Sequence, residues 1–237
     1  MLEPTGRVVM VSGASRGIGL ALARTLHAKG YTVSAGARDP VALAATLAPL
    51  AGDRLLCAAY DAQDRATSRA WVDATVARFG RLDAIVNNAG TSNTFSVEEG
   101  EEADLDALIE INIKGPLFLT RFAMPHLRKA GSGRVVNLSS LSGKRVRNDN
   151  VAYAMSKHAL MALTHSTRRI GWEDGVRATA ICPSFVATDL TAGVTKVARE
   201  EMIDAADLAE LMATVIALPN TAVMAEMIVN CRLEDQY

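Results

Sequence analysis

Residues 8–30 read VVMVSGASRGIGLALARTLHAKG, and this stretch decides the fold. The apolar run at residues 8–11 leads into glycines at positions 13, 17 and 19, and a stretch with helical periodicity follows. Glycines at such a strand-to-helix junction let backbone N–H groups and the positive helix end approach a pyrophosphate closely. The stretch therefore predicts a dinucleotide-binding strand, loop and helix, although a plain tight turn would also use glycine.

Further apolar runs repeat this alternation of a short strand and a longer helical stretch. We expect strands at residues 8–12, 32–37, 55–60, 84–88, 134–139, 177–182 and 226–229. Several are unbroken hydrophobic segments, as is typical of strands covered on both faces, and the segments between them have the length of crossover helices. The sequence therefore predicts an α/β fold, a doubly wound, Rossmann-like parallel sheet of seven strands with helices on both faces. We expect one domain spanning residues 1–237, with its ligand loops beyond the carboxyl ends of the strands.

The composition argues against several classes of protein and partner. The 237 residues are 49% hydrophobic and 22% charged, which excludes disorder and coiled coil. Lys and Arg number 25 against 26 Asp and Glu, so no global positive charge favours nucleic acid or an anionic membrane. Three widely spaced cysteines without a CxxC pair argue against a metal site and favour a reducing compartment. With neither a leader pattern nor a membrane-length apolar run, we expect a cytoplasmic protein.

The glycine spacing, GxxxGxG, resembles the short-chain dehydrogenase/reductase family rather than the GxGxxG fingerprint. The resemblance extends over nearly the whole chain, through Asn87-Asn88-Ala89-Gly90, Asn112, Ser140, Tyr153-Ala-Met-Ser-Lys157, and Pro183 with Thr188. It implies an oxidoreductase that binds a nicotinamide dinucleotide, with Asn112, Ser140, Tyr153 and Lys157 as the catalytic set. The cofactor contacts that we expect are Gly13, Ser15, Arg16, Gly17, Ile18, Gly19, Arg38, Asp61, Ala62, Asn88, Ala89, Gly90, Tyr153, Lys157, Pro183, Val186 and Thr188.

The end of the second expected strand indicates which cofactor is used. NAD enzymes of this architecture carry an acidic residue there, which accepts hydrogen bonds from the ribose 2′-hydroxyl. Here that position is Ala37, followed by Arg38, and Arg16 lies within the glycine loop. Two guanidinium groups could converge on a 2′-phosphate, so we predict NADP(H). The alternatives are that both arginines are ordinary surface charges, or that Asp39 serves the 2′-hydroxyl.

Tyr153 and Lys157 are four residues apart, which places them on one face of a helix. A free phenol has a pKa near 10, and a nearby cation lowers it by roughly 1 to 3. Oxidised nicotinamide, itself positive, would add to the effect. We therefore predict that Tyr153 is the general acid in reduction and the base in oxidation, while Lys157 holds the ribose. The alternative is a half-buried aromatic beside a solvated lysine.

Ser140 lies thirteen residues before Tyr153, a spacing that similar family members show. Its hydroxyl would donate to the substrate oxygen, whereas its neighbour Ser139 would face the other side of the strand. For Asn112, the argument comes from Pro116, which has no N–H and leaves the Asn112 carbonyl without its helical hydrogen bond. The resemblance implies that this carbonyl holds a water linking Lys157 to solvent. The alternative is a simple proline kink.

The substrate is less clearly indicated by the sequence. In the polar loop before the catalytic helix, Arg145, Arg147 or Asn150 could grip a carboxylate or another polar group, although a solvated loop or a subunit contact fits equally. Residues 188–218 provide only a short lid and a helix, which favours a small substrate. The chain also departs from the family at Ser184, where Pro-Gly is usual after the sixth strand.

Together these features predict an NADP(H)-dependent carbonyl reductase or alcohol dehydrogenase acting on a small carbonyl or alcohol compound. One alternative is a catalytically silent NADP(H)-binding redox sensor or scaffold, which would not need Ser140, Tyr153 and Lys157 together. Another is a reductase of 3-oxoacyl thioesters, although Asp174 stands where carrier-linked relatives tend to have a basic residue. We expect a homo-oligomer, dimer or tetramer. The resemblance implies packing through the fourth and fifth expected helices, which are those that contain Asn112 and Tyr153.

Overall fold

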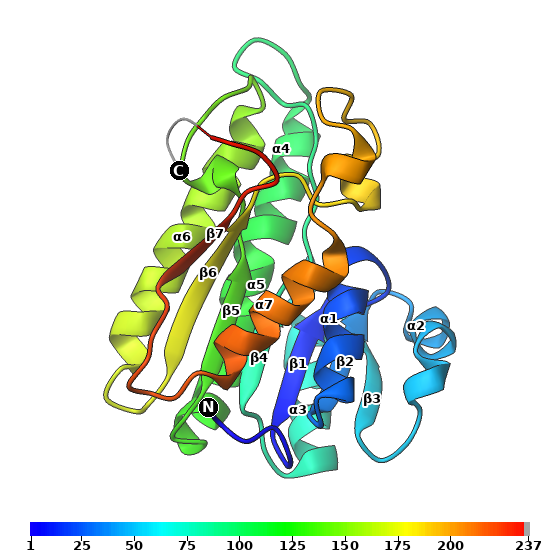
Figure 1. The fold of residues 1–237 in the computed structure, drawn as a ribbon, viewed down its shortest axis with the longest axis vertical. Helices are drawn as coiled ribbons and strands as arrows, with labels where there is room; N and C mark the ends of the chain where they lie inside the picture. Colours follow the sequence, from blue (N-terminus) through cyan, green and yellow to red (C-terminus); the bar gives the residue numbers. More distant parts are fainter. Residues whose placement is uncertain (235–237) are drawn as a thin grey trace.

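The structure is a computed structural model that describes residues 1–234. Seven parallel strands form one sheet in the order β3-β2-β1-β4-β5-β6-β7 (Figure 1). Their bounds are β1 Val8–Ser12, β2 Thr32–Ala37, β3 Leu55–Ala59, β4 Ala84–Asn87, β5 Arg134–Leu138, β6 Arg177–Pro183 and β7 Glu226–Val229. The predicted fold class is confirmed, and each predicted strand differs from the observed one by at most one residue at its end.

Helices cover both faces of the sheet. One face carries α1 Gly17–Ala28, α2 Pro40–Thr46 and α7 Ala205–Ala217, and the other carries α3 Arg65–Phe79, α5 Gly115–Lys129 and α6 Val151–Gly171. Helix α4, Glu102–Ile109, runs through a π-helical segment, η2 Glu110–Lys114, directly into α5. Short 3-10 turns are η1 Ala48–Leu50, η3 Leu141–Gly143, η4 Asp189–Thr191 and η5 Arg199–Glu201. Across residues 1–234, every helix is too short or too polar for a membrane crossing.

The central strands are buried because helices cover them on both sides. Every residue of β1, β2, β4 and β5 is buried, whereas the edge strands β3 and β7 are partly exposed. Gly36 in β2 makes room for Trp71 of α3, since a β-carbon at Gly36 would lie 2.7 Å from the indole ring. The Trp71 Nε1–H donates to Ser34 Oγ at 2.8 Å, so the indole is both packed and hydrogen-bonded.

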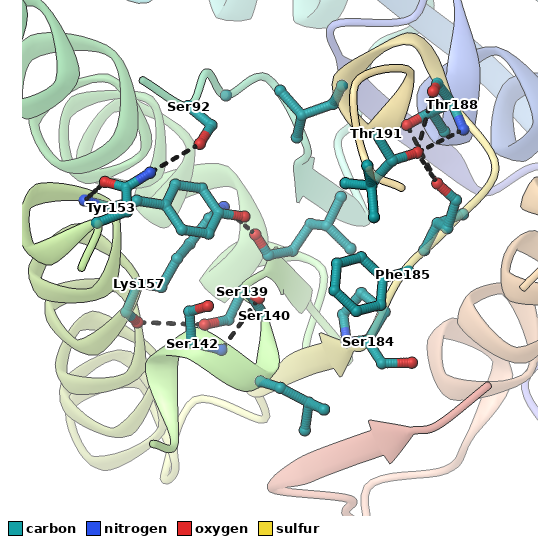
Figure 2. A pocket seen from close by; sticks show the side chains of 18 of the residues that line it. Ser92, Ser139, Ser140, Ser142, Tyr153, Lys157, Ser184, Phe185, Thr188 and Thr191 are labelled. Atoms are coloured by element: carbon teal, nitrogen blue, oxygen red, sulfur yellow. Dashed lines mark hydrogen bonds between the residues drawn. The ribbon is translucent and has the colours of Figure 1, made fainter. Parts of the chain in front are cut away.

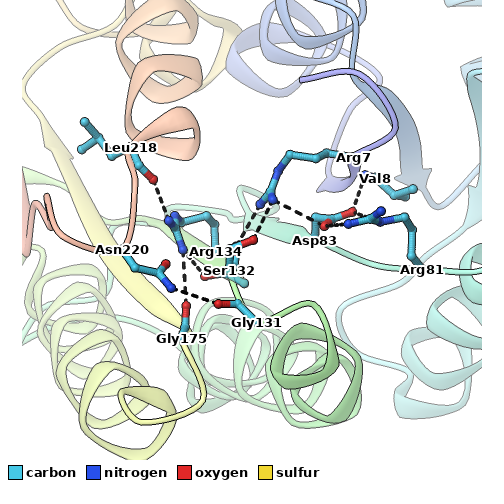
Figure 3. A network of polar contacts seen from close by, with 11 residues as sticks. Arg7, Val8, Arg81, Asp83, Gly131, Ser132, Arg134, Gly175, Leu218 and Asn220 are labelled. Carbon is cyan, nitrogen blue, oxygen red and sulfur yellow. Dashed lines mark hydrogen bonds and ion pairs between the residues drawn. The ribbon is translucent and has the colours of Figure 1, made fainter. Parts of the chain in front are cut away.

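A polar network joins the amino ends of the central strands (Figure 3). The fully buried Asp83 carboxylate accepts from the Val8 N–H at 2.8 Å and from the Arg81 guanidinium, and Arg7 lies 3.6 Å away. Arg134 donates from the start of β5 to the Leu218 carbonyl at 2.6 Å. These contacts connect the first residues of the central strands, so the polar residues at this end of the sheet stabilise the fold. The predicted site residues follow the opposite, carboxyl ends.

Candidate active site

The glycine loop between β1 and α1 has a backbone conformation and a close packing that require glycine. Gly13 and Gly17 have φ values of +66° and +55°, which side chains rarely adopt. A β-carbon on Gly19 would lie 2.3 Å from the Gly13 carbonyl oxygen and 2.5 Å from Asn88 Nδ2, so only glycine fits there. The residue before α1, Arg16, makes no side-chain cap. The first N–H groups of α1 are thus presented without a side-chain partner from their cap, as a pyrophosphate site requires.

A cleft of about 550 Å³ opens beside this loop. It is lined by most of the residues predicted to contact the cofactor: Gly13, Ser15, Arg16, Gly17, Ile18, Arg38, Ala62, Asn88, Ala89, Gly90 and Thr188. The predicted contacts Asp61 and Gly19 do not line it, and the Asp61 carboxylate accepts the Gln63 N–H at 3.0 Å. Sequence reasoning missed Tyr60, Thr91 and Ile111, which also line the cleft. Tyr60 directly follows β3 and Thr91 lies in the loop after β4, so their places beyond strand ends could have indicated these two residues. Nothing in the local sequence indicated Ile111.

Charged side chains at one end of the cleft bear on cofactor choice. Arg16 and Arg38 both line it, and Arg16 also pairs with Asp189 at 3.0 Å, with both side chains largely exposed. Asp39 Oδ1 accepts from the N–H groups of Val41 and Ala42, each at 3.0 Å. Asp39 therefore caps α2 through one oxygen, and it is not among the residues that line the cleft.

Ser140, Tyr153 and Lys157 line one neighbouring cavity of about 300 Å³. In Figure 2 the Tyr153 ring extends from α6 toward Ser140, with Phe185 and Thr188 across the cavity. Ser140 lines the cavity with Tyr153, and its Oγ accepts the Ser142 N–H at 3.1 Å. Ser139, in contrast, is buried and donates its hydroxyl to the Lys157 carbonyl at 3.1 Å. Both serines line the cavity, but the Ser139 hydroxyl is engaged by the backbone of α6.

The electrostatics of this group differ from what the sequence led us to expect. Burial raises the pKa of Tyr153, and the neighbouring Ser140 hydroxyl offsets this only in part. Burial also lowers the pKa of Lys157 to about 8. Its Nζ donates to the Leu138 carbonyl at 2.9 Å and lies 5.4 Å from the centre of the Tyr153 ring. The predicted lowering of the Tyr153 pKa by Lys157 is therefore wrong for the chain alone, because desolvation is the largest effect on the phenol and Lys157 is not among the groups that shift its pKa.

Asn112 lies in the π-helical segment η2 and is buried. Its Oδ1 accepts the Thr91 N–H at 2.9 Å, and its Nδ2 donates to the Thr91 carbonyl at 2.9 Å and to Ser156 Oγ at 3.1 Å. A β-carbon on Gly90 would lie 3.3 Å from Asn112 Oδ1 and 3.8 Å from Lys157 Nζ, so these two groups border the same glycine. The side chain thus links the loop after β4 to α6.

The sequence prediction had concerned the main chain of Asn112. The Gly115 N–H donates to the Glu110 carbonyl, five residues back, so the helical pattern is displaced just before Pro116. Pro116 can donate to no carbonyl at all, which leaves the water relay through Asn112 a prediction. The side-chain role of Asn112 escaped sequence reasoning, because the partners lie far away in the chain.

The fold and the geometry agree with comparisons to known proteins. The family model described as short chain dehydrogenase matches residues 7–199. The chain belongs to the short-chain dehydrogenase family. The resemblance found in the sequence is thereby confirmed, and the protein is an oxidoreductase of a family that uses nicotinamide cofactors.

This short-chain dehydrogenase is 31% identical over 213 residues to an uncharacterized oxidoreductase of Staphylococcus saprophyticus, which covers 89% of the chain and 91% of that protein. It is 42% identical over 228 residues to an agropine synthesis reductase of Rhizobium rhizogenes, with 96% of the chain and 53% of the relative covered. The chain therefore spans about half the length of the curated relatives it matches there.

Two solved structures share the fold of the dehydrogenase. One is a 3-ketoacyl-(acyl-carrier-protein) reductase from Brucella melitensis complexed with NADH, with a TM-score of 0.88, 25% identity, and 96% and 98% of the two chains covered. The other is an alcohol dehydrogenase from the archaeon Thermococcus sibiricus complexed with 5-hydroxy-NADP, with a TM-score of 0.89, 24% identity, and coverage of 98% and 99%. The second likeness supports the fold alone.

The polar loop of the dehydrogenase before α6 makes contacts within the chain. Arg145 and Arg147 both bind the Glu234 carboxylate, Arg147 at 3.0 Å. Asn150 caps α6 by accepting the Tyr153 N–H at 3.2 Å, and it also donates to the Asn93 carbonyl. The carboxylate that the arginines contact in this structure is therefore the chain's own. All three predicted substrate residues nevertheless line the cavity that contains Tyr153.

Ser184, which replaces the usual glycine after β6 in this dehydrogenase, connects β6 to the end of the chain. Its N–H donates to the Val229 carbonyl, and its Oγ accepts the Cys231 N–H, both at 2.9 Å. The side chain thus binds the segment that follows β7. Neighbouring Pro183 and Val186 line the cavity that contains Tyr153 rather than the cleft beside the glycine loop. In residues 1–234, no group of three or more His, Cys, Asp or Glu side chains is arranged to hold a metal ion.

Proposed function

We propose that this dehydrogenase is an NADP(H)-dependent carbonyl reductase or alcohol dehydrogenase that acts on a small carbonyl or alcohol compound. The proposal rests on the observation that the cavity around Tyr153 adjoins the cleft beside the glycine loop. The cavity with Ser140, Tyr153 and Lys157 and the cleft with the glycine loop share several lining residues, among them Asn88, Gly90 and Thr188. A dinucleotide in the cleft would therefore present its nicotinamide to the cavity.

The residues of the cleft fit NADP(H). The first N–H groups of α1 have no side-chain cap and would bind the pyrophosphate, and Arg38 would bind the 2′-phosphate with Arg16 beside it. Lys157 would hold the ribose, and Pro183, Val186 and Thr188 would flank the nicotinamide. When bound, the cofactor supplies or accepts a hydride. Asp39 supports this choice, because it caps α2 and, unlike Arg38, does not line the cleft.

Tyr153 handles the proton in this proposal. Because burial raises its pKa, Tyr153 stays protonated at neutral pH and can donate to the carbonyl oxygen as that oxygen gains charge. Ser140, which lines the cavity with Tyr153, would donate to the same oxygen. The short segment at residues 188–203 would cover the pocket, since Leu190, Thr191 and Val194 line it.

The test is NADPH oxidation, followed by absorbance, with a panel of aldehydes, ketones and keto acids. Tyr153→Phe removes the proton donor and is expected to lower kcat/KM by roughly 100-fold to 10,000-fold. Tyr31→Phe is the matched control, because the Tyr31 hydroxyl is buried at a distance from the cavity and has no hydrogen-bond partner among residues 1–234. Tight NADPH binding without turnover of any compound would instead favour a redox sensor or scaffold.

A second candidate substrate class, 3-oxoacyl thioesters, is favoured by one comparison. The chain is 34% identical over 194 residues to a putative ketoacyl reductase of the monensin polyketide synthase from Streptomyces virginiae, covering 80% of the chain and 74% of that protein. Against it, Asp174 lies at the surface in a pair with Arg128 at 3.0 Å, where an acidic carrier would meet a carboxylate. Including a 3-oxoacyl thioester in the panel discriminates the two classes by kcat/KM.

We also propose that the dehydrogenase forms a homo-oligomer through α5 and α6. These helices and the turn after α6 expose large apolar side chains, namely Leu117, Met155, Ile170 and Trp172. Such side chains lose water-accessible area when two copies pack together. Light scattering coupled to gel filtration measures the mass directly, and a monomer at micromolar concentration would contradict this assembly.

A further inference from the structure

Three arginine side chains surround one carboxylate at the edge of the substrate cavity. Arg145 and Arg147, from the loop before α6, both donate to Glu234 Oε2, and Arg232 Nε lies 4.0 Å from Oε1. The Glu234 side chain is only 2% exposed. All four residues line the cavity that contains Ser140 and Tyr153. A buried carboxylate is thus held by cations within the space where a substrate would bind.

The segment that carries Glu234 has an irregular backbone. It follows β7 without helix or strand, and the neighbouring Leu233 is 95% exposed. The backbone of the segment is anchored at Cys231, whose N–H binds Ser184 Oγ. In Figure 1 the segment, in dark red, runs from the end of β7 toward the start of α6. Among the described residues, the charged partners of the Glu234 carboxylate are the guanidinium groups of Arg145, Arg147 and Arg232.

Arg145 offers a hydrogen-bond donor that Glu234 does not use. Its Nε is buried and has no partner among the described residues. Guanidinium groups bind carboxylates best with paired N–H donors, and a buried donor without an acceptor is costly. The Arg145 side chain lines the cavity, so this donor belongs to a group that borders the space where a ligand would bind. The site is therefore built for a carboxylate but is not fully satisfied by the internal one.

We propose that Arg145, Arg147 and Arg232 form the binding site for a substrate carboxylate, and that Glu234 occupies this site in the free enzyme as an internal competitor. The inference rests on the proposed function and narrows its substrate class to carbonyl compounds that bear a carboxylate. Exchange of one carboxylate for another leaves the arginines with an anionic partner in both states, so no buried cation is left unpaired. Neutral carbonyl compounds gain nothing from the exchange and leave Glu234 in place.

The kinetic test uses short keto acids and their methyl esters as matched pairs, at saturating NADPH. Glu234→Gln removes the competing charge, and we expect it to lower the KM of the acid relative to that of the ester by about tenfold. Arg145→Ala should shift the same ratio in the opposite direction. Glu210→Gln is the matched control, because Glu210 pairs with Lys29 at 2.7 Å on the exposed surface of α7. If Glu234→Gln changes the KM of acid and ester by equal factors, the competitor role is wrong.

A binding test works without turnover. Glutarate, a dicarboxylate that cannot be reduced by hydride transfer from NADPH, is titrated calorimetrically into the NADPH-bound enzyme, and we expect Glu234→Gln to bind it about tenfold more tightly than the unmodified chain. Should Glu234→Gln not fold, Arg145→Lys takes its place and is expected to bind glutarate more weakly, since lysine lacks the planar donor pair.

The two tests separate the inference from the proposed function. Tighter glutarate binding without reduction of any carbonyl compound would support the carboxylate site and contradict the reductase. Reduction of the esters with an unchanged KM ratio and unchanged glutarate affinity would support the reductase and overturn the carboxylate site.

Discussion

Lys157→Met is expected to abolish activity and yet stabilise the fold. Burial lowers the pKa of Lys157 from its usual value of 10.5 to about 8, which corresponds to about 3 kcal/mol spent on keeping the buried ammonium charged at neutral pH. Methionine has a similar length and no charge, so this cost disappears in the variant. Loss of the hydrogen bond to the Leu138 carbonyl takes back about 1 kcal/mol. The variant should therefore be about 2 kcal/mol more stable at pH 7, which raises Tm by roughly 4 to 8 °C.

The pH dependence of this difference identifies its cause. Below about pH 8 both the folded and the unfolded chain hold the Lys157 proton, so the cost of the buried charge is felt in full. As pH rises from 8 toward 10.5, only the unfolded chain keeps this proton, and the stability of the unmodified protein rises. At pH 9.5 about 1.4 kcal/mol of the cost remains. The advantage of Lys157→Met should accordingly shrink to nearly zero there.

The assay is urea unfolding of the cofactor-free protein at pH 7 and pH 9.5, followed by circular dichroism. Lys129→Met is the control, because Lys129 is exposed at the end of α5 and its replacement removes a lysine without removing a buried charge. NADPH-dependent turnover is measured in parallel on both variants. A Lys157→Met protein that is no more stable than the unmodified protein at pH 7, or whose advantage is the same at both pH values, would refute the reasoning.

Further predictions concern the cleft beside the glycine loop and the hydrogen bonds of the Asn112 side chain. Arg38→Ala should raise the KM for NADPH by about 10-fold to 100-fold and leave the KM for NADH nearly unchanged, and equal increases would show that no 2′-phosphate is recognised. Gly19→Ala places a β-carbon against the Gly13 carbonyl and should weaken NADPH binding at least about tenfold in a fluorescence titration, whereas unchanged affinity would contradict the close packing. Asn112→Ala removes three hydrogen bonds and should lower the free energy of unfolding, measured in urea, by about 3 kcal/mol. A loss below about 1 kcal/mol would contradict the stabilising role of these hydrogen bonds.

The sequence by itself determined the sheet and the glycine loop. Buried strands such as β1 read as unbroken apolar runs, and their residues take that form because both faces are covered. Gly13, Gly17 and Gly19 were identifiable because a tight strand-to-helix turn requires glycine locally, whatever the rest of the chain does. The pairing of Tyr153 with Lys157 in one helix was equally local, since residues four apart share a face.

Only the tertiary structure decided the electrostatics and the contacts of the predicted site residues. The pKa of Tyr153 rises instead of falling, because desolvation depends on every segment packed around the hydroxyl group. Likewise Glu234 binds Arg145 across 89 residues of sequence, a contact without any local pattern. Helix and strand periodicity follows from interactions between near neighbours in the chain. Burial and ion pairing depend on which distant segments the fold brings together, and no single stretch of sequence contains that information.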